Sequence, residues 1–164
     1  MLAIANVETP EQRNSVVELA RAIWFEHYPG IISFAQIHYM LERGYRPELI
    51  AQEQHHGIEW HLAVVDAAPV GFVSFGRSAQ DLKVHKVYVL RRAQGLGVGR
   101  ALMDIAHAVA REERYSGVVL TVNIGNLSSI RAYLALGYAF AGRVRMPIGH
   151  GFVMDDYVMR RALS

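Results

Sequence analysis

The chain has 164 residues, a hydrophobic fraction of 52%, a formal net charge of +2 and a sequence pI near 9.0. This length and composition predict one globular domain with a sizeable core, and they exclude a disordered chain. No block of like charges indicates a nucleic-acid surface, no apolar run approaches the roughly eighteen residues of a membrane span, and no signal peptide is recognisable, so we expect a cytoplasmic protein.

Composition also limits the chemistry. The chain contains no cysteine, which excludes a cysteinyl acyl-enzyme, disulfides and thiolate metal ligands. The eight histidines are scattered, and their tightest group, His55, His56 and His61, lacks the His-Glu-x-x-His spacing of a zinc site. We therefore expect no metal site, and any group transfer should be a direct attack on the donor.

Hydrophobic periodicity and turn residues divide the chain into elements without a linker or repeat. Pro10 suits the first position of a helix, Ser33 an N-cap and Gly44 a helix end. We expect strands near residues 2–7, 60–66, 70–76, 82–90, 118–122, 138–144 and 152–160, with a hairpin turn at 67–69. We expect helices near residues 10–28, 34–43, 47–56, 95–114 and 126–136. This order predicts an α+β fold, with a mixed, mostly antiparallel sheet of about seven strands and helices on both faces.

A glycine-rich loop stands between the strand expected at 82–90 and the helix after it. The loop consists of Gln94, Gly95, Leu96, Gly97, Val98, Gly99 and Arg100. Such a loop leaves backbone N–H groups unpaired at the positive end of the helix dipole, which favours a bound phosphate or pyrophosphate. No Lys-Ser or Lys-Thr follows the glycines, so this is no Walker loop. Arg100 and Leu102 stand where a dinucleotide fingerprint needs its last glycine.

A second segment follows the strand expected at 118–122. Asn126 suits a helix N-cap, with Ser128 and Ser129 in the first turn. Tyr133 lies at the centre of this helix, and Gly137 suits the residue after its end, where a positive φ is needed. A Leu-Gly-Tyr sequence then leads into the next strand.

These two segments, in this order and at this separation, resemble the two signatures of the GNAT N-acetyltransferase superfamily. The spacing Gln94-x-x-Gly97-x-Gly99 is similar to the acyl-CoA pyrophosphate loop of that family, and the segment around Asn126 and Tyr133 is similar to its second signature. The order of elements resembles the family over almost the whole chain. The resemblance implies a single N-acetyltransferase domain over residues 1–164 with acetyl-CoA as its co-substrate.

The resemblance also implies where acetyl-CoA binds. Backbone amides of residues 94–100 would hold the pyrophosphate, with added contacts from the side chains of Gln94 and Arg100. The main chain of Val87, Tyr88 and Val89 would bind the pantetheine arm, in a gap where this strand, often bulged in the family, splays from the strand at 118–122. A free N–H near Val89 would polarise the thioester carbonyl. Asn126 and Ser129 would contribute to cofactor binding from the second segment.

Tyr133 matches the family position whose hydroxyl protonates the leaving thiolate. The alternative is a core aromatic residue on an amphipathic helix, because Ile130, Leu134 and Leu136 are apolar neighbours. The match to the signature favours the role of general acid.

A base is also needed for the proton of the acceptor amine. Strand alternation places Lys83, His85 and Val87 on one face, and Val84, Lys86 and Tyr88 on the other. His85 is the best candidate, because an unperturbed imidazole titrates at about 6.5. A structural role for His85, with the proton leaving through a water chain to Glu26, is the alternative.

The N-terminal helices would form the amine pocket. A carboxylate and aromatic rings suit a cation, and the candidates are Trp24, Glu26, Tyr28 and Tyr39. The alternative interpretation is that these residues belong to the core or to the surface and do not contact the amine.

The segments 24–28, 36–41 and 155–159 resemble the bacterial spermidine/spermine-type branch of the family. Arg143 and Arg145 depart from it, since they stand where an acidic loop would attract polyamines. We expect acetyl transfer to a polyamine or another small primary amine, without a nucleic-acid or membrane partner. A peptide or protein N-acetyltransferase and a catalytically weak acyl-CoA sensor are the alternatives. Homodimers are common in the family.

Overall fold

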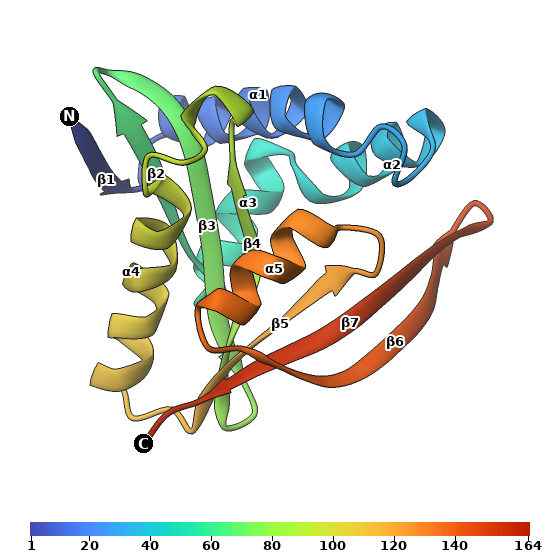
Figure 1. The fold of residues 1–164 in the computed structure, drawn as a ribbon. Coiled ribbons are helices and arrows are strands. Elements are labelled where there is room, and N and C mark those ends of the chain that lie inside the picture. Colours follow the sequence, from blue (N-terminus) through green and yellow to red (C-terminus); the bar gives the residue numbers. More distant parts are fainter.

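The computed structural model describes residues 1–164 and holds one seven-stranded sheet with helices on both faces (Figure 1). The strands are β1 (Leu2–Asn6), β2 (Glu59–Val65), β3 (Ala68–Ser78), β4 (Asp81–Val89), β5 (Gly117–Asn123), β6 (Ala139–Gly149) and β7 (Phe152–Ala162). The helices are α1 (Pro10–His27), α2 (Phe34–Gly44), α3 (Pro47–His55), α4 (Val98–Glu112) and α5 (Leu127–Ala135), with a 3₁₀ turn η1 (Arg91–Ala93). The sheet order is β1-β2-β3-β4-β5-β7-β6, which confirms the predicted fold class.

The centre of the sheet is open at one end. All strand pairs are antiparallel except β4 and β5, which run parallel. Their pairing extends only from Asp81 opposite Gly117 to Val84 opposite Leu120. Both strands continue beyond this point without pairing to each other, so a gap opens between them, as the resemblance predicted.

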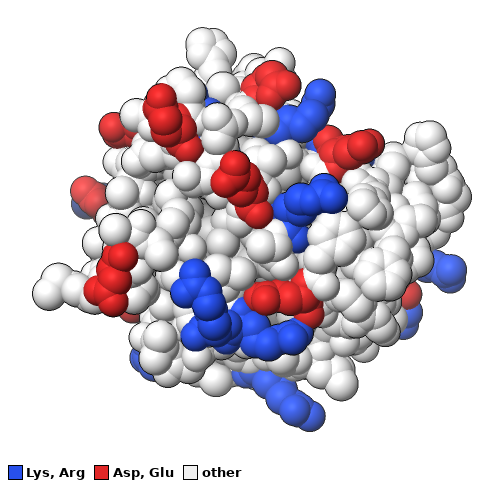
Figure 2. Space-filling view, turned by 90° about the horizontal axis from the view of Figure 1, so that it is seen from above, with Lys and Arg blue, Asp and Glu red and all other residues white.

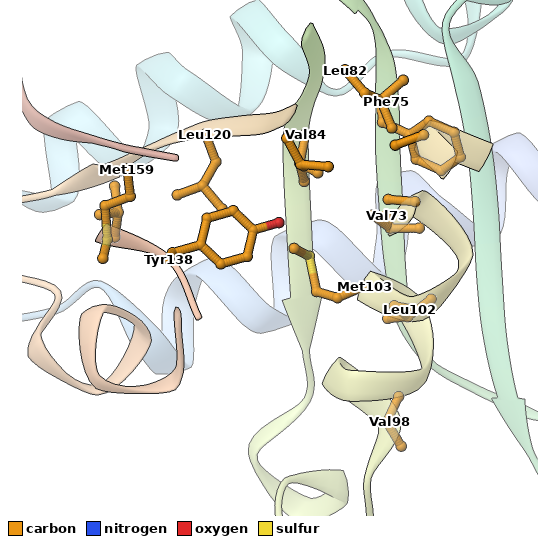
Figure 3. Packing of buried hydrophobic residues seen from close by; sticks show 14 of the residues in the cluster. Val73, Phe75, Leu82, Val84, Val98, Leu102, Met103, Leu120, Tyr138 and Met159 are labelled. Carbon is orange, nitrogen blue, oxygen red and sulfur yellow. The ribbon is translucent and has the colours of Figure 1, made fainter. Parts of the chain in front are cut away.

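The sheet divides the core into two layers. One cluster packs the sheet against α4 and α5, and includes Phe75, Leu102 and Met103 (Figure 3). The other packs the opposite face against α1, α2 and α3, and includes Trp60 and Phe72. Full burial of a large apolar side chain contributes about 1.5–3 kcal/mol. The two layers therefore hold the sheet from both sides and fix the position of the gap.

A β-bulge changes the phase of β4. Its register with β3 passes from Ser74 opposite Lys86 to Phe75 opposite Val84, which leaves His85 without a partner. Val84 and, beyond the bulge, Val87 both pack with the α4 layer, while Lys86 faces the α1–α3 side. The predicted simple alternation, with Val84 and Lys86 on one face, was therefore wrong.

Some boundaries also differ from those expected. The β2–β3 turn consists of Asp66 and Ala67, both at positive φ, so Pro69 lies inside β3. The strands β6 and β7 are longer than predicted and form a long hairpin. The helix α4 begins at Val98, because Gly97 caps it in the left-handed conformation. None of the helices combines the length and apolar character that crossing a bilayer needs.

Candidate active site

Two adjoining pockets open beside the gap between β4 and β5. The first, of about 410 Å³, lies among α1, α2, β4, β5 and the β6–β7 hairpin, and we call it the hairpin pocket. The second, of about 500 Å³, lies among the end of β4, the glycine loop and α5, and we call it the loop pocket. Val87, Tyr88, Ser129 and Tyr133 line both pockets, which therefore meet at these residues.

The glycine loop exposes a row of backbone donors. Gly95 and Gly97 have φ of +81° and +80°, and no atom lies within 4 Å of the place where a Cβ would stand on either. The first bond within α4 runs from the Ala101 N–H to the Gly97 carbonyl, at 3.0 Å. The N–H groups of residues 98–100 thus have no acceptor within the helix, and those of residues 95–97 make no backbone hydrogen bond. These donors, with the guanidinium of Arg100 beside them, suit an anion.

The last turn of β4 presents its main chain to the gap. The Leu90 N–H donates to the Val70 carbonyl at 2.8 Å, so the alternation of an antiparallel ladder turns the N–H and C=O of Val87 and Val89 away from β3. The main chain of Tyr88 faces β3 instead. The side-chain amide of Gln94 donates to the Val89 carbonyl at 3.3 Å, which ties the loop to the strand. The Val89 N–H remains available to the loop pocket.

Asn126 organises the start of α5. Its Oδ1 accepts from the Ser129 N–H at 3.4 Å, which makes it the predicted N-cap. The same atom lies 3.0 Å from Nε2 of His27, at the end of α1. Asn126 is buried and lines the hairpin pocket rather than the loop pocket. It therefore connects α1 to α5 and holds the helix that carries Tyr133.

The hydroxyl of Tyr133 makes no hydrogen bond within the protein, while its ring packs against Tyr138 at a centroid distance of 5.9 Å. Burial raises the pKa of Tyr133, and the neighbouring hydroxyls of Tyr28 and Tyr138 raise it further. The hydroxyl is consequently protonated at neutral pH and can donate to a group that enters either pocket.

Aromatic residues form much of the hairpin pocket. The hydroxyls of Tyr28 and Tyr88 lie 2.9 Å apart, and burial raises the pKa of Tyr28 to about 12. The indole N–H of Trp24 donates to the Tyr45 hydroxyl at 3.3 Å. Trp24 and Tyr28, two of the residues predicted for the amine pocket, thus line the hairpin pocket and are held by bonds within the aromatic cluster.

The other predicted acceptor residues lie elsewhere. The Glu26 carboxylate accepts from the Arg91 N–H at 2.6 Å and ties α1 to η1. The Tyr39 hydroxyl donates to the Ile148 carbonyl at the end of β6. Neither residue lines the hairpin pocket or the loop pocket, and the exposed side chain of Leu96 also lies outside both.

The tip of the β6–β7 hairpin is fastened to α2. Tyr39 and Arg43 both donate to the Ile148 carbonyl, and the Gln36 side chain donates to the Val153 carbonyl at 3.1 Å. A Cβ on Gly149 would stand 2.6 Å from the Tyr39 hydroxyl, so this close approach needs glycine. These contacts close one side of the hairpin pocket.

Apart from the tyrosines, six ionisable groups line the hairpin pocket: Arg43, Glu53, Lys83, His85, Lys86 and Asp156. The Lys86 ammonium lies 5.0 Å from the ring centre of Tyr45 and 5.2 Å from that of Trp60, and burial lowers its pKa. Burial and then the charges of Lys83 and Lys86 lower the pKa of His85 to about 4. Because His85 keeps an exposed surface, water screens part of this effect, and the imidazole is neutral at pH 7.

Asp156 and Lys86 were not predicted as site residues. Asp156 is an acidic residue between Met154 and Val158 on one face of its strand, and this contrast along the face is the signal that could have found it. The side of the sheet that Lys86 faces depends on the bulge, which the sequence pattern did not indicate.

The face of the molecule seen from above has no dominant sign of charge (Figure 2). Figure 2 shows Lys and Arg side chains interspersed with Asp and Glu over the face seen from above. No group of three or more His, Cys, Asp or Glu side chains is arranged to hold a metal ion.

The fold and several sequence segments are similar to those of known acetyltransferases. The chain superposes over 99% of its length on 99% of the PaiA N-acetyltransferase of Thermoplasma acidophilum, solved in complex with coenzyme A, with a TM-score of 0.84 and 19% identity. It is 32% identical over 109 residues to a mycothiol acetyltransferase of Acidothermus cellulolyticus, covering 63% of this chain and 33% of that protein. It is 35% identical over 77 residues to a streptothricin acetyltransferase of Streptomyces lavendulae, covering 47% of this chain and 41% of that protein.

The chain thus spans between a third and about two fifths of the length of these curated relatives. The family profile covers a larger part of the chain. The description of that family is Acetyltransferase (GNAT) family, and the match runs from residue 14 to residue 138, across α1 to the end of α5. With the match over this range, and with the open sheet and the glycine loop in the places that the signatures predict, the chain belongs to the acetyltransferase (GNAT) family.

Proposed function

We propose that this protein transfers the acetyl group of acetyl-CoA to a small primary amine. The observation that carries the proposal is the junction of the two pockets at Val87, Tyr88, Ser129 and Tyr133. A donor in the loop pocket and an acceptor in the hairpin pocket would meet beside the free hydroxyl of Tyr133.

The loop pocket fits acetyl-CoA. The unpaired N–H groups of residues 95–100 and the Arg100 side chain would hold the pyrophosphate, and Leu96 would contribute through its backbone alone. Val87 and Val89 would bind the pantetheine arm as an edge strand binds an added strand. Ser129 would line the same channel, while Asn126 would act by holding α5 in place. When bound, acetyl-CoA supplies an activated thioester.

The residues at the junction suit a direct transfer. The amine nitrogen would attack the thioester carbonyl carbon, and the Val89 N–H would stabilise the negative charge that develops on the carbonyl oxygen. As the carbon–sulfur bond breaks, Tyr133 would give its proton to the sulfur. His85 stays the sequence-predicted base, and its neutral imidazole at pH 7 leaves that role open to it.

The shape of the hairpin pocket supports a small acceptor. Its volume of about 410 Å³ falls within the roughly 300–1,000 Å³ of small-molecule sites, and the fastened hairpin closes one side. The relatives named for mycothiol and streptothricin are in keeping with small acceptors. The spermidine/spermine-type branch stays a prediction from the sequence, as does a homodimer, which light scattering would test. A peptide acceptor would need a more open groove across the hairpin.

The test is thiol release from acetyl-CoA, followed with a chromogenic reagent, against spermidine, simple monoamines, amino acids, aminoglycosides and peptides with a free N-terminus. The protein has no cysteine and so adds no thiol background. We expect saturable release with a small amine. Release with peptides alone would replace the acceptor proposed here. A thermal shift with acetyl-CoA but no release with any amine would favour an acyl-CoA sensor instead.

A further inference from the structure

Asp156 is a buried carboxylate that the fold does not neutralise. It is the only acidic residue among the buried ones, with 7% of its surface exposed. It has no cation within 4 Å, and burial raises its pKa although the nearby Thr121 hydroxyl and the charge of Lys83 favour the ionised form. An unpaired buried carboxylate destabilises a protein, so its presence in a pocket wall calls for a ligand that compensates it.

The neighbouring acid shows the contrast. Asp155 forms a two-bond pair with Arg143, at 2.9 and 2.8 Å, on the other face of the same strand. It lines neither pocket. A structural role accounts for Asp155 and leaves Asp156 unexplained.

The register of the sheet places Asp156 beside the junction. On β7 it lies opposite Asn123, the last residue of β5, which is beyond the point where β4 has separated. The Asn123 carbonyl accepts from the Asn126 N–H at 2.9 Å, at the start of the helix that carries Tyr133, and Asp156, Asn123 and Asn126 all line the hairpin pocket. The carboxylate therefore lies at the reacting end of the hairpin pocket.

None of the other charged side chains of the pocket forms an ion pair with Asp156. Lys86 extends over Trp60 of β2, on the side of β4 away from β7. Glu53 accepts from the Trp60 indole N–H at 3.2 Å and partly balances Lys86. Arg43 and Lys83 add two more cations to the walls, and Lys83 partly stabilises Asp156 from β4 without an ion pair.

We infer that Asp156, in place of the sequence-predicted base His85, binds the ammonium group of the acceptor and takes its first proton, and that the rest of the acceptor is neutral or anionic. This inference rests on the proposed function and names the acceptor class for the same site. A second ammonium would meet Arg43, Lys83 and Lys86 with only Glu53 to balance them, so a polyamine fits less well than a monoamine or an amino acid.

The protons balance as follows. The ammonium R–NH₃⁺ gives one proton to the Asp156 carboxylate, and the free amine attacks the thioester carbon. The carbon–sulfur bond breaks, and the sulfur receives a proton from Tyr133. The nitrogen loses its second proton, which restores the Tyr133 hydroxyl, and Asp156 releases the first proton to water. The products are R–NH–COCH₃, CoA–SH and one proton in solution.

The experiment compares Asp156→Asn with Asp155→Asn as the matched control, using n-butylamine, β-alanine and spermidine as probes. For the best acceptor we expect Asp156→Asn to lower kcat/KM at least about thirtyfold, with most of the loss in the KM of the amine. The control should stay within about twofold, because the surface pair with Arg143 contributes little. The KM of acetyl-CoA and its thermal shift should not change, since Asp156 lies outside the loop pocket. Asp156→Glu, which keeps the charge, should recover part of the activity.

Each outcome has a distinct meaning. If Asp156→Asn and wild type have the same kcat/KM, the inference is overturned while the proposed function stands. If spermidine is the best of the three probes, the acceptor class stated here is wrong. If no amine releases CoA, the proposed function fails, and calorimetry of the CoA-bound protein with the same probes decides the inference. Binding to wild type that is lost in Asp156→Asn would support it, and no binding to wild type would overturn it.

Discussion

The two pockets differ in how the chain builds them. The loop pocket is built largely from main-chain groups. The N–H groups that can bind an anion belong to consecutive residues, 95–100, and the other main-chain groups belong to the end of one strand, at Val87 and Val89. The hairpin pocket collects side chains from α1, α2, α3, β4, β5, β6 and β7. A backbone site depends on local conformation and tolerates varied side chains. A side-chain site depends on the topology that brings distant residues together, so it is the part that can change the acceptor without changing the donor.

The largest effect is expected at the junction that both pockets share. Tyr133→Phe should lower kcat by about ten- to a thousandfold, because it removes the proposed proton donor to the sulfur. The KM values for amine and acetyl-CoA should change much less, since the ring and its packing on Tyr138 remain. Steady-state kinetics across pH measure this.

Tyr157→Phe is a suitable control, because that residue lines neither pocket and its ring packs on Phe140. It should leave kcat close to wild type. Unchanged turnover of Tyr133→Phe at every pH would remove Tyr133 from the chemistry and leave it as a core residue.

A change confined to the loop pocket should weaken the donor alone. Gly97→Ala adds a methyl group into open space, but at a φ of +80° the residue is strained by about 1–2 kcal/mol and the loop relaxes from the geometry that aims its N–H groups. We expect the Kd of acetyl-CoA to rise about tenfold, which corresponds to about 1.4 kcal/mol. Calorimetry with acetyl-CoA measures this.

Gly57→Ala provides the matched control for backbone strain. Gly57 has a φ of +91°, also with open space at the Cβ position, and it lies after α3, outside both pockets. Both variants should lose similar stability without ligand, and only Gly97→Ala should lose acetyl-CoA affinity. An equal affinity for acetyl-CoA in the two variants would argue against the glycine loop as the pyrophosphate site.

This difference between the pockets also explains what the sequence could predict. The glycine loop, the Asn126 cap and the position of Tyr133 depend on residues within a few positions of each other, so the pattern located them. The residues predicted for the acceptor side do not all lie at one pocket. Trp24 and Tyr28 line the hairpin pocket, but Glu26 and Tyr39 are bonded to Arg91 and Ile148, contacts between elements that no local pattern contains.

A weaker effect is expected where α2 holds the hairpin. Tyr39→Phe removes the hydrogen bond to the Ile148 carbonyl, while the bond from Arg43 to the same oxygen remains. The loss should destabilise the protein by about 0.5–1.5 kcal/mol. We also expect the KM of the amine to rise about two- to threefold and the KM of acetyl-CoA to stay the same, because only the hairpin pocket is loosened. Kinetics with both substrates would show this split, and an equal rise in both KM values would contradict it.

The family resemblance implied a bulge in β4, but the alternation of residues did not show where it lies. Alternation assumes one residue per pleat, and the extra residue at His85 reverses the phase for the rest of the strand. Lys86 and Tyr88, which follow the bulge in the sequence, consequently face the hairpin pocket. Lys83, which precedes the bulge, faces the same pocket. The β-branched residues around it predicted the strand correctly, because a bulge needs no change in strand propensity.

The smallest effect concerns the charge of His85. The pKa of this imidazole is about 4 in the folded protein, against about 6.5 in an unfolded chain. Between these pH values the unfolded chain holds a proton that the folded protein lacks, so the free energy of unfolding decreases as the pH falls from about 6.5 to 4. Buried His107, with its pKa also lowered, acts in the same direction, whereas the raised pKa of Asp156 opposes it. Glutamine does not titrate, so in His85→Gln the free energy of unfolding should depend less steeply on pH. The change in slope should correspond to less than one proton, because His85 is exposed and water screens its interactions. Urea unfolding at several pH values measures the slope, and identical slopes for His85→Gln and wild type would show that burial and the two lysines do not hold the imidazole neutral.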